Sequence, residues 1–128
     1  MEPTLSAETA HLICVVEDDD AVRASARLLL EGEGYAVRDY ASAEAILADD
    51  AARDAACLLL DFQLGGITGL ELLENLRVRG VSTPAIILTA NASPPNARLQ
   101  RANVLAVLRK PAPAPEMLDW IQKACSRT

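Results

Sequence analysis

The stretch Ala56-Cys57-Leu58-Leu59-Leu60-Asp61-Phe62-Gln63 decides the fold, because an apolar run ends there in a single carboxylate. A short apolar run bounded by turn residues predicts a strand that is buried on both faces of a sheet. A glycine-containing turn over residues 64–69 follows at once. Asp61 therefore stands at the expected carboxyl end of a strand, the edge where open α/β sheets collect ligands. We interpret Asp61 as a carboxylate presented for reaction.

The length and composition indicate one folded domain. The chain has 128 residues, of which 51% are apolar, and a net charge of -6. An apolar run of about 20 residues, as a membrane span needs, is missing from the sequence, and the N-terminus lacks the features of a secretion signal. We therefore expect a cytoplasmic protein with no membrane contact. The negative charge argues against direct nucleic-acid binding and suits a divalent cation or a basic partner surface.

The three cysteines are scattered, and the chain has one histidine and no CxxC motif. This pattern argues against a zinc site and predicts small core residues in a reducing compartment. The cysteines are Cys14, Cys57 and Cys125.

Strand-like and helix-like patterns alternate along the chain. Strands are predicted at 11–16, 35–40, 56–61, 84–89 and 104–108. Helices are predicted at 21–31, 43–48, 69–79, 97–102 and 116–125. Other segments are read as a flexible tail at 1–10, a turn at 49–55 and a loop at 91–96. Such alternation predicts a doubly wound parallel sheet with helices on both faces.

Local signals support several of these helix boundaries. Thr68-x-x-Glu71 has the form of a capping box, and Ser42 is suited to capping the helix that follows it. Gly80 and Asn103 suit the left-handed conformation that ends a helix.

The last helix carries a stripe formed by Met117, Trp120 and Ala124, offset from Leu118 and Ile121. Two interpretations of this stripe are possible: a partner-contact face, or packing against the neighbouring strand.

Polar side chains stand at four predicted strand ends. Glu17 and Asp18 follow the first strand, Asp61 ends the third, Thr89 ends the fourth and Lys110 follows the fifth. In a parallel sheet of order 2-1-3-4-5 these ends share one edge. Three neighbouring carboxylates repel one another unless they are protonated or bridged by a cation, and Mg²⁺ suits oxygen ligands. Such a set can position and neutralise a phosphoryl group, with Asp61 as the nucleophile.

In these residues the chain resembles the receiver domain of two-component response regulators. The resemblance covers about residues 12–124. It rests on Val15 to Arg23 with its four acids, on Leu59 to Leu64 with Gly69, on Leu88-Thr89-Ala90 and on Lys110-Pro111. It implies a flavodoxin-like fold with five parallel strands and a single domain over residues 11–126.

The resemblance implies that Asp61 accepts a phosphoryl group from a phosphohistidine on a sensor histidine kinase or phosphotransfer protein. Asp18, Asp61 and the backbone carbonyl of Gln63 would ligate Mg²⁺, and Glu17 would act through a bound water. Thr89 and Lys110 would then shift towards the phosphoryl group. Their shift would change a partner-binding face, also a possible homodimer contact, made by segments 97–102, 104–108 and 116–125.

Three positions depart from the common family pattern. Glu17 stands where aspartate is more common, and Gly65 stands where many relatives carry proline. Val107 replaces the Tyr or Phe that the family usually places three residues before the lysine. Valine has no ring to turn inward, so the usual aromatic readout is not expected.

Two alternatives and one question of context remain open. A degenerate receiver would act as a phosphorylation-independent interaction module, although its acids, threonine and lysine are intact. A magnesium-dependent phosphatase of the haloacid dehalogenase type needs a second aspartate, two residues after the first, to act as acid and base. Gln63 stands at that position, so we do not expect an enzyme in the ordinary sense. With no output domain expected in these residues, the chain either acts alone on a downstream partner or belongs to a longer regulator or hybrid kinase.

Overall fold

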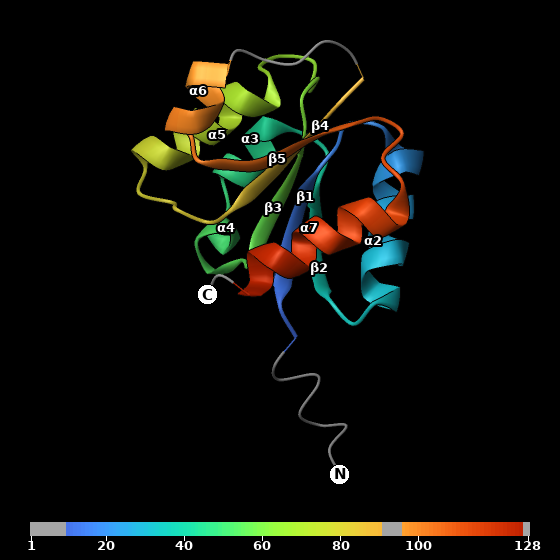
Figure 1. Ribbon diagram of the computed structural model, residues 1–128. Coiled ribbons are helices and arrows are strands. Elements are labelled where there is room, and N and C mark those ends of the chain that lie inside the picture. The colour runs from blue at the N-terminus through green and yellow to red at the C-terminus, as the bar shows by residue number, and fades with distance from the viewer. Residues whose placement is uncertain (1–9, 91–95, 127–128) are drawn as a thin grey trace.

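Five parallel strands form one sheet in the order β2-β1-β3-β4-β5 (Figure 1). The computed structural model describes residues 10–90 and 96–126. The strands are β1 (Leu12–Val16), β2 (Ala36–Tyr40), β3 (Cys57–Asp61), β4 (Ala85–Thr89) and β5 (Val104–Arg109). This confirms the predicted strand order and places β3, with Asp61 at its end, in the centre of the sheet.

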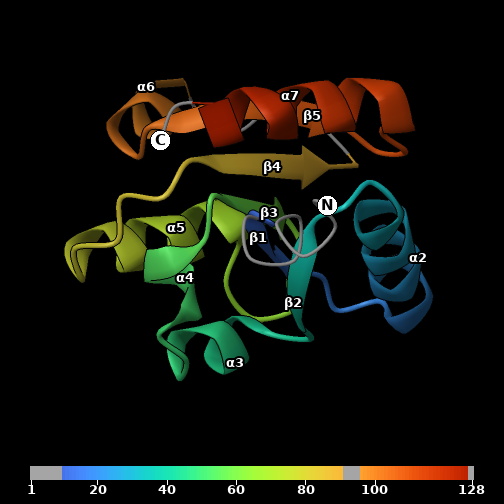
Figure 2. The ribbon, with the colours of Figure 1, turned by 90° about the horizontal axis from the view of Figure 1, so that it is seen from below.

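Helices cover both faces of the sheet (Figure 2). They are α2 (Asp20–Gly32), α3 (Ala43–Leu47), α4 (Ala51–Asp54), α5 (Gly69–Val78), α6 (Asn96–Arg101) and α7 (Ala114–Ser126). Alternate strand residues point to opposite faces and so build two cores. Leu58 and Leu60 of β3 pack in the core under α3, α4, α5 and α6, whereas Cys57 and Leu59 pack in the core under α2 and α7.

The predicted helix boundaries are supported by their caps. The Thr68 hydroxyl accepts a bond from the Glu71 N–H at 3.0 Å, and the Glu71 carboxylate accepts one from the Thr68 N–H at 2.8 Å. The Ser42 hydroxyl caps α3 by accepting from the Ala45 N–H. Asn103 has a φ of 58° after α6, as the sequence predicted.

The structure corrects two predicted boundaries. Segment 49–55 is not only a turn, because residues Ala51–Asp54 form α4. Ala52 is buried there, and its carbonyl accepts a 2.6 Å bond from the Thr83 hydroxyl. The last helix begins at Ala114 rather than at residue 116, since a proline is tolerated in the first turn of a helix.

Burial decides between the two readings of the stripe on α7. Met117 and Ala124 are buried in the core under this helix, and Trp120 packs against the same core while it stays half-buried. The packing interpretation is therefore the one that the structure supports.

Two predicted segments lie mainly outside the described residues: the tail at 1–10, except for its last residue, and the loop at 91–96, except for the first residue of α6. Within the described residues, every helix is too short or too polar to cross a membrane.

Candidate functional site

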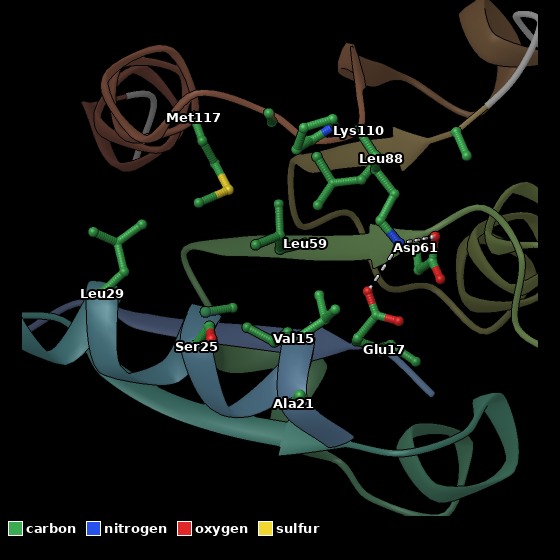
Figure 3. A pocket seen from close by; sticks show the side chains of 16 residues that line it. Val15, Glu17, Ala21, Ser25, Leu29, Leu59, Asp61, Leu88, Lys110 and Met117 are labelled. Atoms are coloured by element: carbon green, nitrogen blue, oxygen red, sulfur yellow. Dashed lines mark hydrogen bonds and ion pairs between the residues drawn. The ribbon is translucent and has the colours of Figure 1, made fainter. Parts of the chain in front are cut away.

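Four strand ends bring the predicted polar side chains to the carboxyl edge of the sheet. The Lys110 ammonium lies 3.2 Å from a carboxylate oxygen of Glu17 and 3.2 Å from one of Asp61 (Figure 3). Carboxylate oxygens of Glu17, Asp18 and Asp61 all lie within 4.8 Å of one another. Glu17 and Asp61 are buried, whereas Asp18 is exposed. Three acids and one base therefore form a single cluster.

Thr89 completes the edge from β4. Its side chain is buried, and its backbone carbonyl accepts a 2.8 Å bond from the Lys110 N–H. Leu88, the residue before it, pairs with Asp61 in the β3–β4 register. The structure thus places Thr89 at the strand end next to Asp61, with its backbone bonded to that of Lys110.

The loop after β3 folds back beside the acids. Gln63, whose carbonyl was the predicted fourth ligand, pairs with Thr68 in an isolated antiparallel bridge. A Cβ added at Gly65 would lie 3.8 Å from a carboxylate oxygen of Asp18, so the loop passes close to that acid. Gly65 has a φ of +86°, a conformation that glycine adopts without strain.

Gly69 stands at the predicted start of a helix, but its close contact with the end of β3 was not predicted. It is the first residue of α5, and its N–H donates a 2.8 Å bond to the Phe62 carbonyl. A Cβ there would overlap the Asp61 carbonyl oxygen and lie 3.1 Å from the Asp61 carbonyl carbon. The missing side chain therefore lets α5 begin directly against the end of β3. A glycine immediately after a strong N-cap was the available signal.

Arg23 is a second residue whose contribution the sequence did not reveal. Its guanidinium donates a 2.9 Å bond to the Glu17 backbone carbonyl and a 2.7 Å bond to the Asp20 carboxylate. The Glu17 side chain is further fixed by a 3.2 Å bond from the Asp19 N–H. Arg23 thus ties the first turn of α2 to the segment that carries the acids.

Burial and neighbouring charge set the protonation of the cluster. Burial raises the pKa of Glu17 above its ordinary value, and the Asp61 carboxylate adds to that rise, while hydrogen bonds from Asp19 and Lys110 oppose it. Burial works against the charged form of Lys110, but hydrogen bonds to Asp61 and Glu17 outweigh it and raise the pKa of the ammonium. One ammonium facing three carboxyl groups leaves an excess of negative charge at this edge.

The donor set fits a hard divalent cation. The three clustered side chains offer only carboxylate oxygens, the ligand type that Mg²⁺ and Ca²⁺ prefer. Glu17 and Asp61 are buried, whereas Asp18 is exposed to solvent. A cation at this edge would relieve the repulsion among the acids.

Comparisons with known proteins identify the family of this chain. The family profile described as the response regulator receiver domain matches residues 13–122. The transcriptional regulatory protein FixJ of Azorhizobium caulinodans is 42% identical over 81 residues, 63% of this chain and 38% of that protein. The sensory/regulatory protein RpfC of Xanthomonas campestris is 34% identical over 112 residues, 84% of this chain and 15% of that protein.

Solved structures show the same fold. The response regulator StyR superposes with a TM-score of 0.86 at 29% identity, covering 93% of this chain and 61% of that one. The CheY-like receiver domain of Methanospirillum hungatei gives a TM-score of 0.82 at 29% identity, covering 93% and 96% of the two chains. This chain spans well under two thirds of the length of the curated regulators cited above. With the family profile matching most of its residues, the chain belongs to the response regulator receiver domains.

Proposed function

We propose that this domain is a phosphoacceptor switch in which Asp61 takes a phosphoryl group from a phosphohistidine. The donor would be a sensor histidine kinase or a phosphotransfer protein. The observation that carries the proposal is the contact between Lys110 and Asp61 at 3.2 Å, beside two further carboxylates. Receiver domains of response regulators have a signalling role, and the family membership of residues 13–122 supports the same role here.

The cluster suggests one task for each residue. An Asp61 carboxylate oxygen attacks phosphorus, so that a P–O bond forms and the P–N bond to the donor imidazole breaks. Lys110 offsets charge on the phosphoryl oxygens, and the Thr89 hydroxyl donates to one of them. Mg²⁺ is the proposed cofactor, and it supplies charge neutralisation when bound. Its ligands would be Glu17 through water, Asp18, Asp61 and the Gln63 carbonyl.

The output face is proposed on α6, β5 and α7. Receiver residues 11–126 would form one domain that passes the signal to a downstream partner protein or to an output domain, with homodimerisation through the same face as an option. Val107 of β5 is half-buried against the core under α6. An aliphatic side chain there suggests that the signal travels through movement of the strand and α6 rather than through a turning ring. We also propose a cytoplasmic location, where a kinase donor would be found.

Intact-mass measurement tests the phosphoacceptor. The parent treated with acetyl phosphate and Mg²⁺ should gain about 80 Da, the mass of one phosphoryl group. Asp61→Asn should not gain it, whereas Asp54→Asn, an exposed acid in α4, should behave as the parent. A parent that stays unmodified under these conditions would favour the degenerate interaction module instead.

The coupling to the output face needs a separate measurement. Thr89→Ala should still accept the phosphoryl group, because Asp61 and the acids remain, but should show a smaller change in the amide NMR spectrum of α6 and β5. An equal spectral response in Thr89→Ala and the parent would contradict the proposed role of the hydroxyl.

A further inference from the structure

A pocket of about 690 Å³ lies between α2 and α7, on the face of the sheet opposite α5. It begins at Glu17, Asp61 and Lys110 and extends away from them towards Leu29 and Met117 (Figure 3). Most of its lining residues lie beyond the acid cluster, and the proposed phosphoacceptor role does not use them.

The floor of the pocket follows from the alternation of strand side chains. Val15 of β1 and Glu17, which directly follows this strand, are two residues apart, as are Leu59 and Asp61 of β3. Residues two apart in a strand point to the same face. The apolar floor under α2 and α7 therefore continues directly into the buried carboxylates at the edge of the sheet.

Small side chains leave the space between the two helices unfilled. The first two turns of α2 present Ala21, Ser25 and Ala26 to the pocket, and Ala112 lines it from the segment before α7. Longer side chains at these positions would bridge the gap between the helices. The result is an apolar recess, and Val22, which also lines it, is 40% exposed.

The charges at the polar end indicate the kind of molecule that fits. The Lys110 ammonium is already paired with the Glu17 and Asp61 carboxylates, so an anionic ligand group would compete with these carboxylates for Lys110. A cationic ligand group would compete with Lys110, or with a divalent cation, for the acids. Among the other described lining residues, Ser25 is the one whose side chain can form a strong hydrogen bond. Everything else in the recess is aliphatic, thioether or proline surface.

We propose that this pocket is a binding site for a small, uncharged and largely apolar molecule. Its volume lies within the range of about 300–1,000 Å³ that is typical of small-molecule sites. The apolar body of the ligand would lie over Val15 and Leu59 between α2 and α7, and one polar group would reach the Ser25 hydroxyl. Binding does not require that Asp61 be phosphorylated, so the site stands independently of the proposed function.

The test uses N-phenyl-1-naphthylamine, an uncharged apolar dye that fluoresces when it leaves water. The parent should bind it saturably. Ala26→Leu and Ala112→Leu each place a larger side chain into the pocket, from opposite walls, and should weaken binding by at least about tenfold. Ala45→Leu makes the same change at an exposed position of α3 and should bind as the parent does. Circular dichroism establishes that each variant is folded.

A second readout on the parent keeps the test sharp if a filled variant fails to fold. Methyl NMR should show dye-induced shifts for Leu29 and Met117, and none for Leu28 and Val78, which are 73% and 88% exposed outside the pocket. Shifts at the methyl groups of all four residues, unsaturable binding, or equal affinity in the filled variants would overturn the proposal. So would sedimentation showing a dimer that Ala26→Leu disrupts, since the pocket would then be a contact between two copies.

Discussion

Replacing Gly69 by alanine tests how tightly α5 is built against the end of β3. The added Cβ would lie 3.1 Å from the Asp61 carbonyl carbon and 3.3 Å from the Phe62 Cα, and would overlap the Asp61 carbonyl oxygen. All three neighbours are backbone atoms, so no side-chain rotation relieves the overlap. Either α5 or the end of β3 must move, and that movement strains the 2.8 Å bond from the Gly69 N–H to the Phe62 carbonyl.

The expected loss of stability follows from the size of that clash. Overpacking a tight site costs about 1–3 kcal/mol, and immobile backbone neighbours place this case near the middle of the range. A loss of about 2 kcal/mol lowers the folding equilibrium constant roughly 30-fold. For a domain of this size it lowers the unfolding midpoint by roughly 6–10 °C.

Urea and thermal unfolding of Gly69→Ala and Gly66→Ala provide the measurement. Gly66 lies in the same loop, has no neighbour within 4 Å of the position that a Cβ would take, and is not among the glycines with positive φ. Gly66→Ala should therefore change the free energy of unfolding by less than about 1 kcal/mol. If the two variants prove equally stable, the close approach of α5 to Asp61 is wrong.

Three further predictions concern other parts of the fold. Arg77→Ala should lower the free energy of unfolding in urea by about 3 kcal/mol, because the half-buried guanidinium donates to backbone carbonyls at 2.7, 2.8 and 3.0 Å. Arg79→Ala removes one exposed hydrogen bond and should lower it by less than about 1 kcal/mol. The Tyr40 hydroxyl donates a 2.8 Å bond to the Asp49 carboxylate and holds the pKa of that group below its ordinary value. The stabilisation from this bond is fully present above about pH 3.9 and disappears as the pH falls through the lowered pKa of Asp49. Tyr40→Phe should raise the pKa of Asp49 in an NMR titration, and an unchanged value would contradict the assignment. Burial raises the pKa of all three cysteine thiols, that of Cys14 to about 11. The cysteines of the native protein should therefore resist a disulfide reagent at pH 8 and react fully once the protein is unfolded. Rapid labelling of the native protein would refute their burial.

Most of the fold was predictable because its strands are short apolar runs that end in charged or turn residues. Parallel strands place their carboxyl ends on one edge, so Asp61 and Lys110 could be expected to meet although 49 positions separate them in the numbering. The helix α4 could not be predicted, since four residues are too few to display a helical period. Its formation depends on burial of Ala52.

Features that arise from contact across the fold left no pattern in the sequence. The contact of Gly69 with the Asp61 backbone depends on where α5 meets β3, and the Arg23 bond to the Glu17 carbonyl depends on how α2 leaves the sheet. The pocket between α2 and α7 depends on the separation of two helices that are far apart in sequence. Residue spacing predicts which face a side chain occupies, but not how much room is left beside it.

The bond from the Lys110 N–H to the Thr89 carbonyl joins the ends of β4 and β5 into one mechanical unit. A displacement of either strand end must carry the other with it or break a 2.8 Å hydrogen bond. Substitutions at these two positions should therefore be non-additive, because residues that share a bonded network seldom act independently. A substitution that alters the Thr89 hydroxyl will leave the Lys110 ammonium undisturbed only if the backbone of both strands keeps its position.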